Sequence, residues 1–399
     1  QGINMSKSYY EFFCPVKVIA GNAALEHIPF ELDILGSKRP MIITDKGVRA
    51  VGLLKHIEGA FTSADINVST IFDDVPPDSS IETVHAAAKV YNDNGCDAII
   101  AVGGGSVSDT CKAVNILVSE GGDDLRTYSG AHVLKRPLKP LFVVPTTSGT
   151  GSETTAIAVI SDNQAGVKMP FVSYFLMPNA AVLDPRMTLT LPPHITAMTG
   201  MDAMTHAIEA YTCMAHNPIS DAYATSAIAK ISTNLLKVLD TPSDSDGRLE
   251  LAQASTMAGI AFSNAMVGLV HSLGHSLGAA SHLPHGLCMN LFLPYVLEFN
   301  KDKNGDRIAD LLLPIAGAEV YASTPAAQRA DRAIEEIRRM RDEIHARCKL
   351  PRTLQETGKV TRDQFDHIAD LTLDDGSIVI NPKEVDRKQV LALLEKAWG

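Results

Sequence analysis

The sequence predicts an α/β domain with a parallel sheet, followed by an all-α domain. Three observations lead to this fold class. Short apolar runs alternate with helix-like segments through the first half of the chain. Near residue 185 the strand signals nearly vanish, and long segments with apolar residues at helical spacing take over. The length of 399 residues suits two or three domains, at roughly 150 residues each.

Buried strands are expected in the first half wherever a short apolar run is bounded by turn residues. A helix is expected over 80–92, and another begins at Ser108 after a glycine-rich turn. Continuous apolar strands connected through helices predict a parallel sheet that is covered on both faces. The expected strands are 40–44, 68–72, 97–102 and 141–144.

The second half is expected to consist of helices, and Pro382 is expected to open the last one. We place the domain boundary at residue 190, which gives domains 5–190 and 191–399. The first domain starts at Met5 because the four residues before it look like the remnant of a cleaved tag. The expected helical segments are 195–214, 219–239, 248–264, 266–280, 326–347 and 383–397.

Composition excludes several classes of protein. A net charge of −11 disfavours nucleic-acid binding, which needs a basic face. No apolar run approaches the roughly 18 residues of a membrane helix, and no signal peptide is visible. The six cysteines are scattered without a CxxC pair, which is typical of reduced thiols in the cytoplasm. One basic run, Arg338–Arg341, follows Glu335 and Glu336, and we interpret it as the solvated face of a helix.

The turn Gly103-Gly104-Gly105-Ser106 lies between an expected strand and an expected helix that carries Asp109 in its first turn. Consecutive glycines let the backbone approach a ligand, and the helix start offers N–H groups to a phosphate. Many strand–helix turns use glycine only for close packing, so the motif alone leaves both interpretations open.

Asp45 follows an expected strand, where an acidic residue can hold the ribose hydroxyls of a dinucleotide. It lies 58 residues before Gly103, however, whereas the usual Rossmann order places it after the glycine loop. A helix N-cap is the alternative role. The segment Pro145–Glu153 is rich in hydroxyl groups, including Thr146, Thr147 and Thr150, and suits ribose and phosphate contacts; a surface loop is the alternative.

Two pairs of polar residues are spaced four apart on expected apolar helices, so each pair shares one helix face. They are Asp202 with His206, and His271 with His275. A carboxylate with several imidazoles is a typical site for a divalent transition metal. A histidine on an apolar face is usually a core residue, but two such pairs favour a metal site.

Two more histidines, His282 and His285, are expected in a loop closed by Gly286. The spacing alone does not say which histidines are ligands. Neither 195–229 nor 251–300 contains a lysine or arginine. Because a phosphorylated or carboxylated substrate would need a cationic partner, the site suits a small neutral molecule.

Four segments together resemble the iron-containing (group III) alcohol dehydrogenases: 103–109, 145–152, 200–209 and 271–286. The resemblance runs from Tyr10 to Asn381-Pro382. It implies a dehydroquinate synthase-like architecture, NAD as cofactor and one divalent metal, usually Fe²⁺, with Zn²⁺ as the alternative. The implied metal ligands are Asp202, His206, His271 and His285.

The resemblance also implies roles for residues around the cofactor and substrate. His275 would orient the substrate or relay protons, and Phe262 would line the substrate pocket. Asp45 would select NAD over NADP, and Lys168 would lie near the cofactor. The remaining implied cofactor-binding residues are Gly103, Gly104, Gly105, Ser106, Asp109, Thr146, Thr147 and Thr150.

The predicted function is hydride transfer between NAD(H) and a small neutral primary alcohol or aldehyde, by a cytoplasmic homodimer with neither a nucleic-acid nor a membrane partner. A dehydroquinate-synthase-like NAD/metal lyase is one alternative, but it would need cations around its substrate. A zinc-containing glycerol dehydrogenase and a non-catalytic nucleotide- or metal-binding protein are the others. The physiological substrate, the metal, the oligomeric state and the preferred direction stay open.

Overall fold

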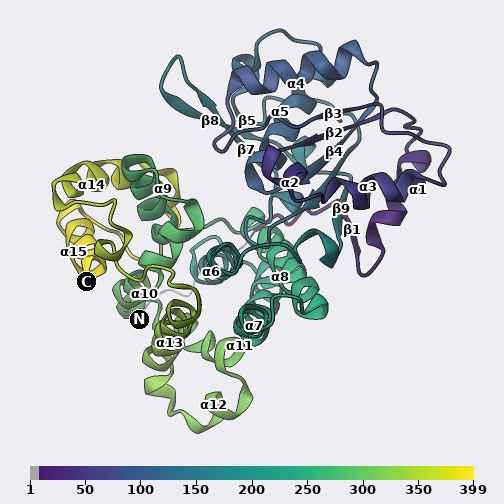
Figure 1. The fold of residues 1–399 in the computed structure, drawn as a ribbon. Helices are drawn as coiled ribbons and strands as arrows, with labels where there is room; N and C mark the ends of the chain where they lie inside the picture. The colour runs from purple at the N-terminus through teal and green to yellow at the C-terminus, as the bar shows by residue number, and fades with distance from the viewer. Residues whose placement is uncertain (1–8) are drawn as a thin grey trace.

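The computed structural model describes residues 9–399, so the expected tag remnant and the domain start at Met5 lie outside the described residues. Its main element is a six-stranded sheet in the order β1-β9-β6-β4-β2-β3, in which every pair of neighbours is parallel (Figure 1). The strands are β1 (Lys17–Ala20), β2 (Pro40–Thr44), β3 (Thr70–Phe72), β4 (Ala98–Gly103), β6 (Leu141–Pro145) and β9 (Ala180–Leu183).

Helices cover both faces of this sheet, as the continuous apolar strands predict. On β4, Ile99 and Ala101 face a core formed with α4 (Ile81–Asp93) and α5 (Gly105–Glu120). The alternate residues of β4, Ile100 and Val102, face the opposite core. That core is formed with η1 (Ala24–His27), α1 (Ile28–Ile34) and α3 (Leu54–Phe61).

A second, three-stranded sheet was not expected from the sequence. Its strands β7 (Ile157–Asp162) and β8 (Val167–Val172) form an antiparallel hairpin, and β5 (Gly130–Ala131) pairs with β8. β7 alternates between buried and more exposed side chains along most of its length, so it lacks the continuous apolar run that marks the central strands.

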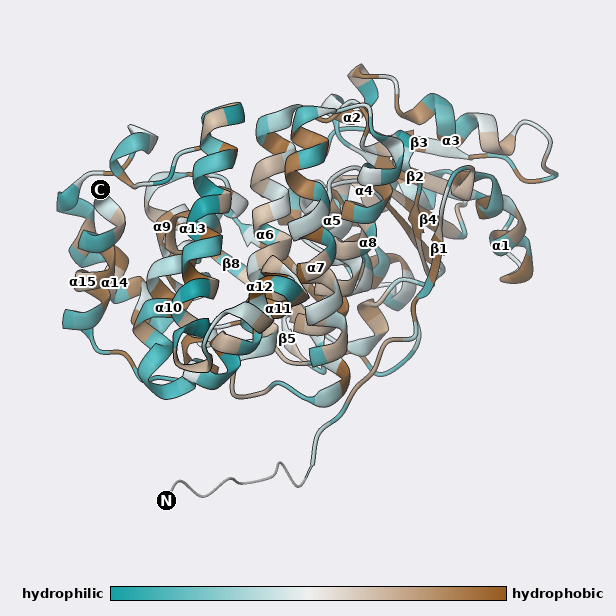
Figure 2. Ribbon diagram, turned by 90° about the horizontal axis from the view of Figure 1, so that it is seen from below, coloured by the Kyte–Doolittle hydropathy of each residue, from teal (hydrophilic) through white to brown (hydrophobic). Residues whose placement is uncertain are grey.

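The second half is helical (Figures 1 and 2), and its helices share one large apolar core. The domain division at residue 190 falls between β9 and α6 and stays a prediction. Among residues 9–399, no helix is both long and apolar enough to cross a membrane. The principal helices are α6 (Pro193–Thr212), α7 (Pro218–Asp240), α8 (Ser245–Ser263), α9 (Leu269–Ser281), α10 (His285–Asp310), α13 (Arg329–Cys348), α14 (Phe365–Asp374) and α15 (Arg387–Trp398).

Three expectations about these helices were wrong. His285 is the first residue of α10, not part of a loop, and Gly286 packs where a Cβ would lie 2.7 Å from the carbonyl oxygen of Met198. The last helix opens at a capping box on Asp386, four residues after Pro382.

The third expectation concerns α13, which Figure 2 colours largely as hydrophilic. Arg339 does lie on its solvated face, with a 66% exposed side chain. Arg341, in contrast, is 4% exposed and Met340 is also buried, because this side of α13 packs against α10.

The segment after β6 packs against helix α8 of the helical half. Gly151 and Gly259 of α8 touch through their backbones, since a Cβ at Gly259 would lie 2.6 Å from the carbonyl oxygen of Gly151. The hydroxyl of Thr256 donates a 2.7 Å hydrogen bond to the carboxylate of Glu153 in the same segment. The loop that is rich in hydroxyl groups is therefore held between the sheet and the helical core.

Candidate active site

Three helices bring four metal-ligating side chains together. Asp202 and His206 come from α6, His271 comes from α9, and His285 opens α10. One donor atom from each residue lies within 4.8 Å of the other three. The Nε2 atoms of His285 and His206 lie 3.4 and 3.8 Å from Oδ1 of Asp202.

Two atoms of this cluster are buried without a hydrogen-bond partner among the described residues: Oδ1 of Asp202 and Nε2 of His271. A buried polar atom left unpaired is costly, so each needs a partner that the chain itself does not supply. One carboxylate and three imidazoles are a donor set suited to Fe²⁺ or Zn²⁺. The residues therefore fit a single divalent cation between the three helices.

The electrostatics of the cluster also suit a cation. Burial alone would raise the pKa of Asp202, but the neighbouring imidazoles hold it below its ordinary value. Burial lowers the pKa of His206 to about 3 and holds the pKa of His271 well below its ordinary value. Both imidazoles are neutral near pH 7 and keep a lone pair for a metal. The adjacent carboxylate of Asp202 outweighs desolvation and raises the pKa of His285.

Groups outside the cluster orient two of the imidazoles. Nδ1 of His271 lies 2.6 Å from the carboxylate of Glu209, and Nδ1 of His206 lies 3.3 Å from the carbonyl oxygen of Gly149. Burial raises the pKa of Glu209 to about 7, although backbone N–H groups of Gly268 and Val270 donate to it. Such contacts at Nδ1 direct Nε2 toward a metal.

Sequence reasoning assigned no role to Glu209. Its signal was available, because residues 202, 206 and 209 fall on one face of a helix at spacings of four and three.

His275 lies at the edge of the cluster, with its ring centroid 5.6 Å from that of His271 and 5.3 Å from that of His285. Its Nδ1 lies 2.9 Å from Oδ2 of Asp375. Burial would raise the pKa of Asp375, but the contact with His275 and the other hydrogen bonds at the carboxylate lower it. Asp375 also accepts hydrogen bonds from Ser272 and Ser377, so its position is fixed independently of His275. Asp375 was not predicted.

The resemblance implies that Phe262 lines the substrate pocket. In the structure Phe262 packs against the candidate metal ligands. Its ring stacks on that of His206, with centroids 4.4 Å apart and an interplanar angle of 22°. This contact covers one face of a candidate ligand with an apolar ring.

The glycine turn lies at the carboxyl end of β4, and no side chain of the described residues caps the α5 N-terminus that follows it. A Cβ at Gly103 would lie 2.5 Å from Val107, and one at Gly105 would lie 2.9 Å from Thr150. The glycines therefore serve close packing and also leave the N–H groups of α5 open. Such a helix start fits a pyrophosphate group.

The hydroxyl-rich loop lies beside the glycine turn, because β4 and β6 are neighbours and both end there. A Cβ at Gly104 would lie 3.4 Å from the hydroxyl of Thr147, and Thr146 follows β6 directly. Ser106 is exposed in the first turn of α5. The carboxyl ends of parallel strands are where open α/β sheets bind ligands.

Two acidic residues and one lysine are predicted to bind the cofactor, and they lie at three different places in the fold. Asp45 follows β2 at the same sheet edge, and its carboxylate caps α2 (Lys46–Ala50) by accepting from Val48. The carboxylate of Asp109 accepts from Ser152 and from the backbone of Val159. Lys168 lies on β8 and pairs with exposed Asp78 at 2.8 Å. Their roles in cofactor binding stay predictions.

Lys112 is a further residue that sequence reasoning missed. It is fully buried, and its ammonium group donates to the hydroxyls of Ser152 and Thr155 and to the carbonyls of Thr155 and Ile157. Burial lowers its pKa to about 8. A lone lysine within the apolar run of α5 was the available signal. Its contacts attach the end of the hydroxyl-rich loop and the start of β7 to helix α5.

Comparison with known proteins finds relatives that match both halves of the chain. Residues 15–185 match the family described as Iron-containing alcohol dehydrogenase, and 196–398 match the C-terminal part of the Fe-containing alcohol dehydrogenase family. The chain is 34% identical to Alcohol dehydrogenase 4 of Saccharomyces cerevisiae over 389 residues, covering 97% of this chain and 98% of the yeast protein. It is 33% identical to the NAD-dependent methanol dehydrogenase of Bacillus methanolicus over 386 residues, covering 97% and 99%.

A solved structure also closely resembles the structure of this chain. The crystal structure of a 1,3-propanediol oxidoreductase superposes with a TM-score of 0.92 at 32% identity, covering 98% of this chain and 100% of that chain.

Proposed function

Because the chain belongs to the iron-containing alcohol dehydrogenase family, we propose that it transfers a hydride between NAD(H) and a small neutral primary alcohol or its aldehyde. The observation that carries this proposal is the cluster of one carboxylate and three imidazoles, three of the four residues buried, in which Oδ1 of Asp202 and Nε2 of His271 have no hydrogen-bond partner among the described residues. The open start of α5, at the carboxyl ends of β4 and β6, provides the matching cofactor site.

Four residues would hold the metal: Asp202, His206, His271 and His285. A divalent cation bound there supplies Lewis-acid polarisation of the substrate oxygen. The carboxylate of Glu209 keeps His271 oriented through Nδ1.

The other residues bind and orient the reactants. The glycine turn and the N–H groups of α5 bind the cofactor pyrophosphate, and Asp45 accepts from the adenosine ribose. Phe262 provides an apolar wall beside His206 and excludes water from the reacting carbon. His275 is fixed by Asp375 at Nδ1, which leaves its Nε2 to exchange a proton at the edge of the site.

A neutral substrate follows from the charge of the surrounding helices. The segments 195–229 and 251–300, which supply all four candidate ligands, carry no lysine or arginine. A phosphorylated or carboxylated substrate, such as the lyase alternative requires, would lack a cationic partner on these helices. The family match likewise does not favour the lyase or the zinc glycerol dehydrogenase.

We further propose that the protein acts in the cytoplasm as a homodimer. No disulfide joins the cysteines within residues 9–399, which suits a reducing compartment. Strand β1 is at the edge of the six-stranded sheet, and exposed apolar side chains lie on and before it: Tyr9, Tyr10, Phe13 and Val18. An apolar sheet edge suits an isologous contact with a second copy, which sedimentation velocity would detect.

The decisive test of the activity is nicotinamide absorbance during turnover by anaerobically iron-reconstituted protein. A panel of short primary alcohols and aldehydes is assayed with NAD(H) and, separately, NADP(H). We expect NAD(H)-linked turnover that is lost in His271→Ala and kept in His367→Ala, where an exposed histidine on α14 is removed. Absence of turnover with every pair, despite a filled metal site, would contradict the proposal.

A further inference from the structure

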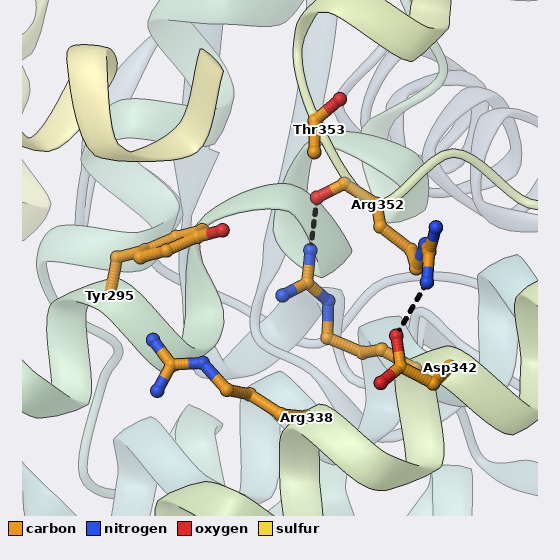
Figure 3. A pocket seen from close by; sticks show the side chains of 6 residues that line it. Tyr295, Arg338, Asp342, Arg352 and Thr353 are labelled. Carbon is orange, nitrogen blue, oxygen red and sulfur yellow. Dashed lines mark hydrogen bonds and ion pairs between the residues drawn. The ribbon is translucent and has the colours of Figure 1, made fainter. Parts of the chain in front are cut away.

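A pocket lies between α10, α13 and the segment that follows α13 (Figure 3). Its volume is about 210 Å³. Tyr295 comes from α10, ten residues after His285, which places it roughly 15 Å along the helix from that candidate ligand. The pocket is therefore separate from the proposed hydride-transfer site. The six lining residues are Tyr295, Arg338, Arg341, Asp342, Arg352 and Thr353.

The central feature of this pocket is the buried guanidinium of Arg341. It donates one hydrogen bond to the carbonyl oxygen of Arg352, and its Cζ lies 5.8 Å from the centroid of the Tyr295 ring, with the Tyr295 hydroxyl nearby. Its Nε is buried without a hydrogen-bond partner, and no carboxylate of residues 9–399 lies within 4.0 Å of its nitrogens. Burial lowers the pKa of Arg341. Burying a guanidinium without a carboxylate in contact with it is costly.

Arg248, another deeply buried arginine, shows how this chain satisfies the donors of a structural guanidinium. Arg248 is 2% exposed, and it donates hydrogen bonds to three oxygen atoms of its own chain. Arg341 is nearly as buried, at 4%, but it donates to only one backbone oxygen among the described residues, and its other polar neighbour is Tyr295. Packing alone therefore does not account for a charged residue at position 341.

The two flanking arginines each contact a carboxylate directly, whereas Arg341 makes no ion pair within residues 9–399. Arg338 pairs with Glu298 at 2.7 Å, and Arg352 pairs with Asp342 at 2.7 Å and with Glu356 at 3.3 Å.

Both arginines still have donors to offer. In Figure 3 the side chains of Arg338 and Arg352 flank the pocket on either side. Nε of Arg352 is buried and, like that of Arg341, lacks a partner among the described residues.

We propose that this pocket binds a small oxyanion, a phosphate or a carboxylate, on Arg341, with Arg338 and Arg352 as flanking donors. The planar guanidinium fork matches two oxygens of such a group, and Arg341 has no ion-pair partner of its own among residues 9–399. The bound anion would connect α13 and the segment after it to α10. Asn290 of α10 already donates a 3.0 Å hydrogen bond to the carbonyl of Pro351, so the anion would tighten an existing junction.

The test measures anion binding to metal-loaded protein, freed of excess metal, in the presence of saturating NAD so that the phosphate-binding turn at α5 is filled. Thermal melting and isothermal titration calorimetry follow additions of inorganic phosphate or of acetate, with chloride at matched ionic strength as reference. We expect a saturable rise in melting temperature over chloride with phosphate, acetate or both. Stronger binding of phosphate would identify a phosphate ester as the ligand class, and stronger binding of acetate would identify a carboxylate.

Variants locate the anion. Arg341→Gln should weaken binding by about tenfold or more, since it removes the unpaired donor group. Arg339→Gln, which removes an exposed arginine of the same helix, should bind as the wild type does. If Arg341→Gln does not fold, Arg338→Gln, whose side chain is only partly buried, serves instead and should also weaken binding.

Two results would overturn the proposal: no phosphate- or acetate-specific shift in the wild type, or the same shift in wild type, Arg341→Gln and Arg338→Gln. Neither readout depends on turnover. Failure of the anion site is thus distinct from failure of the dehydrogenase proposal.

Discussion

Nδ1 of His271 lies 2.6 Å from Oε2 of Glu209, and the same buried carboxylate also accepts hydrogen bonds from the backbone N–H groups of Gly268 and Val270. When the Glu209 carboxylate is ionised, Nδ1 carries the ring proton and donates to it, and Nε2, which has no partner within the described residues, is left for a metal. This contact makes Glu209 a positioning residue for the candidate metal site.

Glu209→Gln should weaken metal binding by about 10- to 100-fold, because the neutral amide orients the imidazole less strongly and lowers its basicity. Competition with a chromophoric chelator measures the affinity. Glu319→Gln, at an exposed position of α12 (Ala318–Ser323), is the matched control. Equal affinity in both variants would show that Glu209 only fills space.

Substitutions at Asp45 should separate its capping role from its proposed role in cofactor choice. Asp45→Ser keeps an N-cap oxygen for α2 and removes the charge, whereas Asp45→Ala removes both. Both variants should raise kcat/KM with NADP(H) relative to NAD(H) by about tenfold or more, since the repulsion of a 2′-phosphate is relieved. Only Asp45→Ala should lose stability, by about 1 kcal/mol. An unchanged cofactor ratio in both variants would refute the selection role.

Asp375→Asn should lower kcat by about tenfold or more while metal content and the KM for NAD stay near wild type. The reason is that His275 loses the charged acceptor that fixes its orientation. Asp374→Asn changes the exposed neighbour and should have wild-type kinetics. A parallel loss of metal in Asp375→Asn would instead assign the residue to the structure of the metal site.

The ion pair between Arg126 and Asp162 should make stability depend on acid pH. Two guanidinium nitrogens of Arg126 contact the carboxylate at 2.6 and 3.1 Å, and the pKa of Asp162 is lowered from 3.8 to about 2. A folded pKa below the unfolded value stabilises the protein above pH about 4, and this contribution is lost as the pH falls toward 2.

Arg126→Gln should therefore melt below the wild type at pH 7, and the difference should shrink between pH 4 and pH 2. Calorimetric scans across this pH range measure it. A difference that stays constant with pH would mean that the ion pair does not set the pKa of Asp162.

The sequence reveals those parts of the fold whose signals are local. Strand β4 runs straight into the glycine turn, and the pair Asp202 and His206 shares one helix face, so both could be predicted from neighbouring residues. The contact between His275 and Asp375 joins positions 100 residues apart and arises only when α9 and α14 pack together. Nothing near Asp375 in the sequence marks it.

Short or interrupted elements were missed for the same physical reason. Strand β9 is four residues long, and it pairs with β1, which lies about 160 residues earlier in the chain. Helix α10 contains Pro294, a residue that normally ends a helix pattern. Here the helix continues because its residues are buried among those of its neighbours, and tertiary packing outweighs the local preference.

The order of these elements along the chain has a consequence for synthesis of the protein on the ribosome. Every strand of the six-stranded sheet precedes residue 184, whereas the last candidate ligand is residue 285. At about 5 to 20 residues per second, translation of the intervening 100 or so residues takes roughly 5 to 20 s. The nascent chain thus completes its sheet, and the turn that would receive NAD, before it has the histidines to hold a metal. Metal loading is therefore expected to be the later event in the maturation of each newly made chain.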